Sequence, residues 1–356
     1  MKIDYKELFE IEPYSVSQID KEPWFFKNIK KLSNHHYKNC DEYRKLANKI
    51  FMPISKCVTI FDIPYIPSSL FKTHTLKSEI LNNSSKVFTS SGTSGSTKSK
   101  IVLDKKTSLL QSRALSKIYA SIVDKGIKIF FIDSEDIING SKSLSARGAA
   151  IKGFYQFVRN PEYLLDKNGN INIAPIKKFV SEFPNEKFII FGFTSLIWIN
   201  LIAQLKNKKI RIKKNNGVLI HGGGWKKLYD KKVDRKKFNA EIKSRVGIDI
   251  VHNYYGMIEQ TGSIFLECEN GFYHASIFSD IIVRGENLEP CAIGQKGLIQ
   301  VISLLPLSYP GHNILTEDIG KLEGFDNCTC GRKGKFFSID GRVPGTELRG
   351  CSDVGS

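Results

Sequence analysis

One polar stretch of the sequence has the composition of a phosphate-binding loop. Every residue from Thr89 to Thr97 is glycine or carries a hydroxyl group, and Lys98 follows directly. Such a run has almost no apolar side chain to bury, and its glycine N–H groups, hydroxyls and lysine suit a phosphate chain. It lacks the Gly-Lys-Ser/Thr ending of a Walker loop, and a flexible Ser/Gly linker is the alternative interpretation. The candidate residues are Ser90, Ser91, Gly92, Thr93, Ser94, Gly95, Ser96 and Thr97.

A second segment that could bind a nucleotide follows an expected strand at residues 248–252. The segment from Tyr254 to Gln260 places Glu259 beside aromatic and glycine residues. Mg²⁺ bound together with nucleotide phosphates usually takes one or two carboxylates, so Glu259 is suited to hold it. Tyr254 or Tyr255 could stack on a base. A surface turn with a solvated glutamate is the alternative.

Two further side chains could contact a nucleotide. Asp318 lies at an expected junction of strand and turn, where its carboxylate could bind the two hydroxyls of a ribose. Arg342 supplies a cation in a Gly-Arg turn.

A set of cysteine and histidine residues in the C-terminal third could bind a metal ion, separately from the nucleotide candidates. The sequence contains Cys268 and His274 with five residues between them, and Cys328 and Cys330 with one. Three thiols and an imidazole fit a structural, tetrahedral Zn²⁺ site. Four unconnected residues in turns are the alternative. We expect the remaining cysteines Cys40, Cys57 and Cys291 to have no special role.

The surrounding pattern predicts the elements that position these residues. Residues 1–50 show helical spacing of apolar side chains. Apolar strands at 127–133, 187–193 and 218–220 alternate with helices at 195–205 and 238–246, which indicates a largely parallel α/β sheet with ligands at the carboxyl ends of its strands. Short strands and turns follow from residue 262. We therefore expect an N-terminal helical and extended region (1–80), an α/β nucleotide-binding core (81–262), a β-rich lobe (263–340) and a short tail (341–356).

Composition narrows the class of protein. A formal net charge of +17 is typical of proteins that bind nucleic acids. However, the lysines are spread along the chain, and no nucleic-acid-binding motif occurs. We expect most of this charge to be a solvated surface and no nucleic-acid partner. The N-terminus has no apolar leader, no run of apolar residues is long enough to span a membrane, and seven cysteines is an odd number. A cytoplasmic protein with free thiols is the expectation.

The order of these motifs resembles that of the adenylate-forming (AMP-binding) enzymes, which activate a carboxylate with ATP and release pyrophosphate. The order is a hydroxyl/glycine loop, a second glycine loop at 221–225, Tyr-Gly-x-x-Glu, Thr-x-Asp and Gly-Arg. The resemblance implies the large domain of that fold, with stacked, largely parallel sheets, helices and a β-rich C-terminal lobe. Only fourteen residues follow Arg342, so we expect the mobile C-terminal cap of that superfamily to be absent.

Longer segments along the whole chain look like one branch of that superfamily, the LuxE-type acyl-protein synthetases. These segments are residues 67–72, 145–149, 191–194, 221–228, 255–260, 308–312 and 347–353. The family activates a fatty acid as its acyl-adenylate, carries the acyl group on its own cysteine and works with an acyl reductase subunit.

The resemblance assigns a role to each matching position. The loop from Ser90 to Thr97 would bind the phosphates, Glu259 would ligate Mg²⁺, and Asp318 would hold the ribose hydroxyls with Arg342 nearby. Cys351 would accept the acyl group, whereas without the resemblance it would be an idle thiol on a loose tail. The adenosine would be lined by His221, Gly222, Gly223, Gly224, Tyr254, Tyr255 and Gly256.

Together these features predict a ligase that depends on ATP and Mg²⁺ and transfers an acyl group to its own Cys351. The alternative is an AMP-forming acyl- or aryl-CoA ligase of the phenylacetate-CoA-ligase-like type, in which free coenzyme A accepts the acyl group. The expected substrate is a fatty or other carboxylic acid, and the expected partner is an acyl reductase or an acyltransferase.

Overall fold

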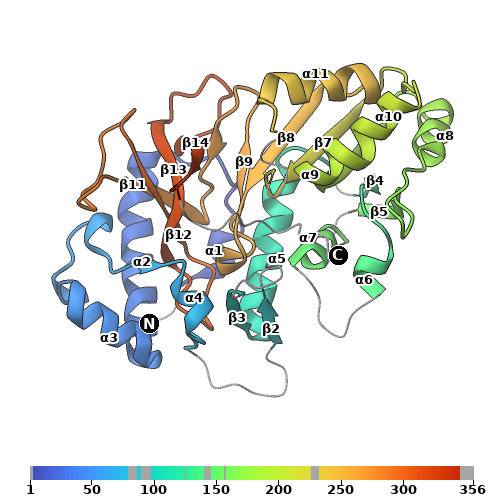
Figure 1. Cartoon of the computed structure of the whole chain (residues 1–356). Coiled ribbons are helices and arrows are strands. Elements are labelled where there is room, and N and C mark those ends of the chain that lie inside the picture. The colour runs from blue at the N-terminus through green and yellow to red at the C-terminus, as the bar shows by residue number, and fades with distance from the viewer. Residues whose placement is uncertain are drawn as a thin grey trace. The chain divides into compact units, whose positions relative to one another are not determined.

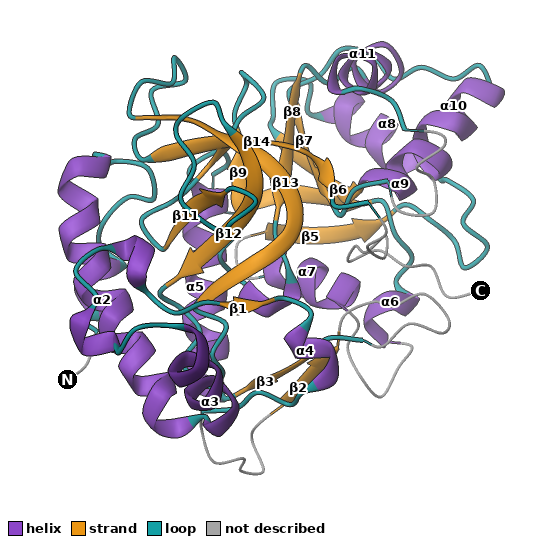
Figure 2. Cartoon of the chain, turned by 60° about the vertical axis from the view of Figure 1, so that its left-hand side comes forward, coloured by secondary structure: helices purple, strands orange, loops and turns teal. Residues whose placement is uncertain are grey.

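The computed structural model describes residues 3–78, 86–89, 98–124, 126–139, 146–155, 158–225 and 232–344. These residues fall into two compact units (Figures 1 and 2). Residues up to 121 and from 256 to 344 form the first, which we call the β-rich unit. Residues 122–255 form the second, which we call the parallel unit.

The parallel unit contains the predicted parallel sheet. Its strands lie in the order β8-β7-β6-β4-β5, and each neighbouring pair is parallel. Every residue of β6 and β7 is buried, as expected for parallel strands that are covered on both faces. The strands are β4 (Ile127–Phe131), β5 (Val158–Tyr163), β6 (Phe188–Phe193), β7 (Gly217–Gly222) and β8 (Ile250–Tyr255).

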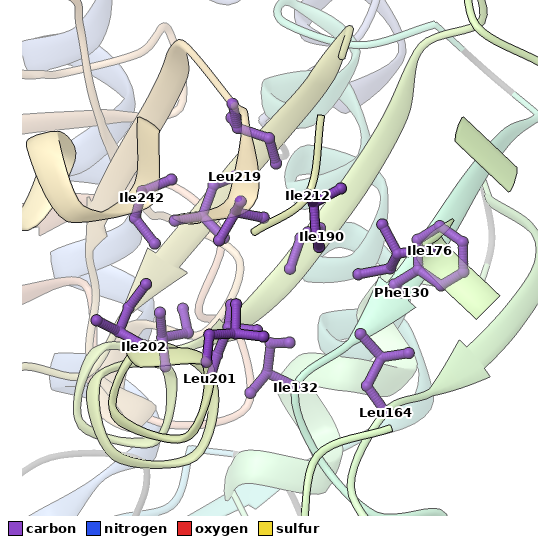
Figure 3. Close-up of a cluster of buried hydrophobic side chains, with 14 of the residues drawn as sticks. Phe130, Ile132, Leu164, Ile176, Ile190, Leu201, Ile202, Ile212, Leu219 and Ile242 are labelled. Atoms are coloured by element: carbon purple, nitrogen blue, oxygen red, sulfur yellow. The ribbon is translucent and has the colours of Figure 1, made fainter. Parts of the chain in front are cut away.

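Helices cover both faces of this sheet. On one face Leu201 and Ile242 pack against Leu219 in the cluster of Figure 3. On the other face Phe154 of α7 contacts Phe191, with 4.3 Å between the ring centroids. The predicted helix at 195–205 is confirmed, and its middle is a π-helix. The helices are α6 (Asp136–Asn139), α7 (Ala146–Phe154), α8 (Ala174–Glu182), α9 (Thr194–Leu196), η3 (Ile197–Ala203), α10 (Gln204–Asn207) and α11 (Arg235–Val246).

The β-rich unit contains the predicted short strands. Its main sheet has the order β11-β12-β13-β14-β10-β9 with antiparallel neighbours, and β1 pairs in parallel with β13. A separate antiparallel pair, β2 and β3, flanks residues 90–97, which confirms the two strands predicted on either side of the Ser/Gly stretch. The strands are β1 (Ile66–Pro67), β2 (Lys86–Thr89), β3 (Lys100–Leu103), β9 (Phe265–Glu267), β10 (Tyr273–His274), β11 (Ser279–Arg284), β12 (Lys296–Ser303), β13 (Asn313–Phe325) and β14 (Lys335–Arg342).

The predicted N-terminal helices also belong to the β-rich unit. Ser17 caps the long helix α2, because its hydroxyl accepts a hydrogen bond from the N–H of Asp20. Phe25 and Ile29 of α2 are fully buried. No helix among the described residues is long and apolar enough to cross a membrane. The helices are α1 (Tyr5–Leu8), α2 (Gln18–Asn39), α3 (Asp41–Ile50), α4 (Leu70–Thr73) and α5 (Lys105–Ala120), with short 3₁₀ turns η1 (Ile54–Lys56), η2 (Ile60–Asp62) and η5 (Ile258–Gln260).

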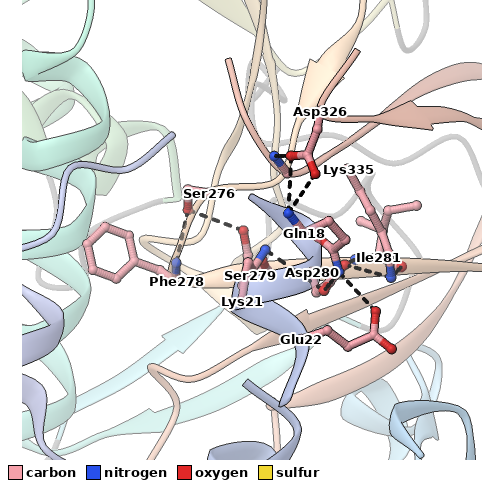
Figure 4. Close-up of polar contacts among 11 residues, drawn as sticks. Gln18, Lys21, Glu22, Ser276, Phe278, Ser279, Asp280, Ile281, Asp326 and Lys335 are labelled. Carbon is pink, nitrogen blue, oxygen red and sulfur yellow. Dashed lines mark hydrogen bonds and ion pairs between the residues drawn. The ribbon is translucent and has the colours of Figure 1, made fainter. Parts of the chain in front are cut away.

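A buried ionic cluster joins α2 to the sheet of this unit (Figure 4). The carboxylate of Asp280 lies 3.8 Å from the ammonium of Lys21 and 3.0 Å from that of Lys335. Each ammonium also donates to a backbone carbonyl, Lys21 to Ser279 and Lys335 to Ile281. Residues far apart in the chain are therefore held together by charges that water does not reach.

Candidate functional site

In the parallel unit, the predicted adenosine-binding residues lie at the carboxyl ends of the strands. His221 and Gly222 end β7, and Tyr254 and Tyr255 end β8. The register pairs Gly222 with Tyr254. Because neighbouring strands are parallel, their carboxyl ends share one edge of the sheet, where ligands bind in open α/β folds.

His221 is a buried, neutral histidine with a defined proton position. The hydroxyl of Thr194 donates to the carbonyl oxygen of Gly222 (3.0 Å) and lies 2.9 Å from Nδ1 of His221. Since the single hydroxyl proton is used on Gly222, Nδ1 must donate to Thr194, and Nε2 is left as an acceptor. Burial, with the nearby charges of His252 and Arg235, lowers the pKa of His221 to about 3. This side chain can accept a hydrogen bond at neutral pH but cannot serve as a cation.

The three glycines after His221 suit the shape of the turn. A Cβ atom on Gly222 would come within 2.6 Å of the Tyr254 ring. Gly223 and Gly224 have φ angles of +80° and +65°, in the left-handed region that favours glycine. This turn therefore presents bare backbone beside the ring of Tyr254, which stacks on Phe191 with an interplanar angle of 13°.

Asp133 and Arg147 form a buried ion pair that the sequence did not lead us to select. Asp133 follows β4, and its carboxylate lies 3.0 Å from Nε and 3.1 Å from Nη2 of Arg147 in α7. Burial raises the pKa of Asp133, and the charge of Arg147 opposes that shift. Arg147 belongs to the small-residue segment 145–149, which was part of the family resemblance, so a signal for this pair was present.

In the β-rich unit, Asp318 and Arg342 are direct neighbours, as the sequence predicted. They pair across β13 and β14, with 2.9 Å between Nε of Arg342 and Oδ1 of Asp318. Arg342 also lies 3.4 Å from the carboxylate of Glu317. The backbone N–H of Asp318 donates to the hydroxyl of Thr316, which donates to the carbonyl of Ile299. Both carboxylates are therefore held at fixed positions on β13.

Glu259 lies in the same unit and is only 5% exposed. Burial raises the pKa of its carboxyl group, while the hydroxyl of Ser99 and the charge of Arg342 lower it, and the charge of Glu317 raises it. The charges of Arg342 and Glu317 therefore act on the carboxyl group of Glu259. Ser99 is 1% exposed and was not among the predicted residues, because it lies just beyond the stretch that its composition marked.

Glu259 and its neighbours offer donor types that suit a magnesium ion bound together with nucleotide phosphates. Such an ion usually takes one or two carboxylates from the protein, and Glu259 and Asp318 each offer one. Arg342 lies 2.9 Å from the carboxylate of Asp318 and 3.4 Å from that of Glu317, so its charge offsets part of theirs. The predicted phosphate-binding residues 90–97 and the predicted acyl acceptor Cys351 lie outside the described residues.

The predicted cysteine–histidine set converges in the β-rich unit. The donor atoms of Cys268, His274, Cys328 and Cys330 all lie within 4.8 Å of one another. The Sγ atoms of Cys268 and Cys328 are 3.9 Å apart, and Sγ of Cys330 is 3.4 Å from Nε2 of His274. A tetrahedral Zn²⁺ with ordinary bond lengths requires about 3.8 Å between two sulfurs and about 3.6 Å between sulfur and nitrogen. The donor set therefore fits zinc in type, number and spacing.

Comparisons with known proteins show which family and which fold the chain shares. The sequence matches the family "Acyl-protein synthetase, LuxE" over residues 2–356. A long-chain-fatty-acid–luciferin-component ligase of Aliivibrio fischeri is 27% identical over 307 residues, covering 83% of this chain and 78% of that protein. The protein of the same name from Vibrio harveyi is 24% identical over 341 residues, covering 91% and 85%. A solved 2-hydroxyisobutyryl-CoA ligase in complex with its acyl-AMP superposes with a TM-score of 0.70 at 13% identity, covering 93% of this chain and 69% of that one.

The chain has the fold of the adenylate-forming ligases. The chain belongs to the acyl-protein synthetase family LuxE. It is therefore an AMP-forming ligase that acts on an acyl group, as the sequence predicted.

Proposed function

We propose that the protein activates a fatty acid with ATP as the acyl-adenylate and then transfers the acyl group to its own Cys351. The match to the acyl-protein synthetase family over residues 2–356 carries this proposal. The contact between Asp318 and Arg342, and the burial of Glu259 in the same unit, support the nucleotide-binding part of it.

The proposed reaction has two steps. In the first, a carboxylate oxygen of the fatty acid attacks the α-phosphorus of ATP, and pyrophosphate leaves. In the second, the thiolate of Cys351 attacks the acyl carbon, the bond to the phosphate oxygen breaks, and AMP leaves. A carboxylate is a poor electrophile, whereas the mixed anhydride has a good leaving group, so activation makes attack by a thiol feasible.

Each unit, taken separately, contains residues with a proposed nucleotide-binding role. In the parallel unit, the turn from Gly222 to Gly224 and the ring of Tyr254 bind the adenosine, and Nε2 of His221 accepts a hydrogen bond. In the β-rich unit, Asp318 holds the ribose hydroxyls and Glu259 binds the metal. When bound, Mg²⁺ would neutralise phosphate charge and favour the departure of pyrophosphate.

The substrate and partner follow from the relatives. The named relatives are ligases for long-chain fatty acids, so a fatty acid is the proposed substrate. An acyl thioester on a protein is an intermediate, and we propose an acyl reductase or an acyltransferase as the partner that takes it up.

Two measurements test the two steps separately. Purified protein should exchange labelled pyrophosphate into ATP when a fatty acid of suitable length is supplied. With ATP and labelled fatty acid but without coenzyme A, it should also acquire label that hydroxylamine releases, and Cys351→Ser should lose this label while retaining exchange. No exchange with any fatty or aromatic acid would refute the proposal, and product formed only with coenzyme A would identify an acyl-CoA ligase instead.

We also propose that Cys268, His274, Cys328 and Cys330 bind a structural Zn²⁺. The support is the distances between their donor atoms, which agree with a tetrahedral site. Four protein ligands fill all positions of a tetrahedral site, so no position is open for a substrate. The role of the ion would therefore be to stabilise the fold. Purified protein should contain about one equivalent of zinc.

A further inference from the structure

One segment that carries the family resemblance, Ser308–His312, has no assigned role, although the structure buries it completely. Ser308, Tyr309 and His312 are each 0% exposed. The segment lies between β12 and β13 and belongs to no helix or strand. A buried irregular segment must find partners for its polar groups, so its contacts show what it supports.

Ser308 connects the segment to the elements that follow the Ser/Gly stretch. Its hydroxyl donates to the carbonyl of Val102 in β3 at 2.8 Å. Its backbone N–H donates to the hydroxyl of Thr107 at the start of α5 at 3.1 Å. Its carbonyl accepts from the N–H of Ser78 at 2.7 Å. Three chain segments are therefore fixed to one residue.

Tyr309 joins the segment to α5 and to α4. Its phenol oxygen accepts a hydrogen bond from Nε2 of Gln111 in α5 at 3.1 Å. Its ring packs edge-on against Phe71 of α4, with 6.1 Å between the ring centroids.

Gly311 packs against the backbone of Glu259 itself. A Cβ atom at this position would come closer than 3.0 Å to the carbonyl oxygen of Glu259 and to the ring of Tyr309. At the end of the segment, His312 stacks on His36 of α2 with 4.5 Å between ring centroids, and its Nε2 lies 2.9 Å from the hydroxyl of Ser33. The segment is thus held rigidly on one side and contacts Glu259 on the other.

We propose that Ser308–His312 is a positioning element of the ligase, which holds the backbone of Glu259 so that its carboxylate meets the magnesium ion of the nucleotide. This inference rests on the proposed function, because it assumes that Glu259 binds the metal. Gly311 is the residue that makes the close approach possible, and Ser308 is the residue that anchors the segment.

The test is Gly311→Ala, with Mn²⁺ used in place of Mg²⁺. Binding of Mn²⁺ in the presence of a non-hydrolysable ATP analogue can be measured by electron paramagnetic resonance, independently of turnover. We expect the dissociation constant for Mn²⁺ to rise roughly tenfold, since a 1 Å displacement of a ligand removes most of one metal contact. The Mg²⁺ concentration for half-maximal pyrophosphate exchange should rise by a similar factor.

Gly324→Ala is the matched control. Its added Cβ would lie 2.7 Å from the side chain of Asn327, so it crowds β13 in the same unit but does not contact Glu259. It should leave metal affinity unchanged even if it lowers the melting temperature. If Gly311→Ala does not fold, Ser308→Ala removes the anchor without adding volume, and it should weaken Mn²⁺ binding roughly threefold.

The outcomes separate the two proposals. If the wild-type protein exchanges pyrophosphate and both Gly311→Ala and Ser308→Ala bind Mn²⁺ with wild-type affinity, the positioning role is refuted and the proposed function stands. If the wild-type protein neither binds metal with the nucleotide analogue nor exchanges pyrophosphate, the proposed function fails and the positioning role fails with it.

Discussion

At the scale of single residues, the carboxylate of Glu259 is tuned by neighbours that are distant in the sequence. Burial raises its pKa, and the hydroxyl of Ser99 is the largest influence in the opposite direction. A metal ligand must be ionised, so the Ser99 hydroxyl extends the pH range in which Glu259 can bind a cation. Ser99 is thus a candidate positioning residue on the C-terminal side of the Ser/Gly stretch.

Ser99→Ala should shift the acid limb of the pH profile to higher pH. Removing the hydroxyl raises the pKa of Glu259 further, so a smaller fraction of the carboxylate is ionised at a given acidic pH. We expect pyrophosphate exchange at pH 6 to fall roughly fivefold relative to the wild-type protein, with the two rates converging at alkaline pH. Ser121→Ala, which removes a hydroxyl bonded to Ile118 at the end of α5, is the control and should keep the wild-type profile. An equal loss at every pH would argue against this explanation.

Thr194→Val tests the proton position on His221. Valine keeps the shape of threonine but removes the hydroxyl that accepts from Nδ1, so Nε2 is no longer fixed as the acceptor. We expect KM for ATP to rise on the order of fivefold with little change in kcat. The exposed Thr73→Val is a control that should show wild-type kinetics. Unchanged KM in Thr194→Val would mean that His221 does not contact the nucleotide.

At the scale of elements, the cysteine–histidine set joins two short turns of the β-rich unit. Cys268 and His274 flank the turn between β9 and β10, and Cys328 and Cys330 lie between β13 and β14. Cys268, Cys328 and Phe336 form a small buried cluster between these turns. A metal ion would link the two turns directly.

Cys268→Ser should abolish zinc binding and destabilise the protein. We expect the zinc content to fall from about one equivalent to near zero and the melting temperature to fall by roughly 10 °C. Treatment of the wild-type protein with a strong chelator should have a similar effect. Cys291→Ser, at a partly exposed cysteine outside the set, should change neither quantity. Wild-type protein purified with no metal would refute the site.

At the scale of the whole molecule, the β-rich unit is held together by contacts between the two ends of the chain. Lys21 of α2 and Lys335 of β14 share the carboxylate of Asp280, and Asp326 accepts from the backbone N–H of Gln18 at 2.8 Å. Burial lowers the pKa of Lys21 to about 8, although the charge of Asp280 opposes that shift. The burial of this ammonium group makes the stability of the unit dependent on pH.

Lys21→Met should change the pH dependence of stability. The pKa of Lys21 is lower in the folded protein than in the unfolded chain, so the unfolded state binds more protons between pH 8 and pH 10.5. The contribution of Lys21 to the free energy of unfolding therefore rises with pH across this range, by on the order of 3 kcal/mol. The stability difference between wild-type and Lys21→Met protein, measured by urea unfolding at pH 7–10, should shift in favour of the wild type as pH rises. The exposed Lys27→Met should show no such trend.

Much of this architecture could be predicted from local sequence. Continuous apolar runs predicted β4, β6 and β7, because strands buried on both faces contain few polar residues. Cysteine and histidine spacing predicted the zinc-site candidates, since each pair lies within a short turn. Motif order predicted the family, and it placed Arg342 near Asp318, where the structure has it.

The sequence alone determined which residue types are available and which elements they form, since periodicity, turn residues and metal-ligand spacing are local properties. The tertiary structure decided which residues from separate elements meet. Ser99 beside Glu259, Arg147 beside Asp133, and the contact of Gly311 with Glu259 join segments that are 14 to 160 residues apart in the chain. Burial then sets the pKa values of the ionisable side chains and the size of side chain that each position accepts. Burial is a property of the packed molecule, and no local sequence pattern contains it.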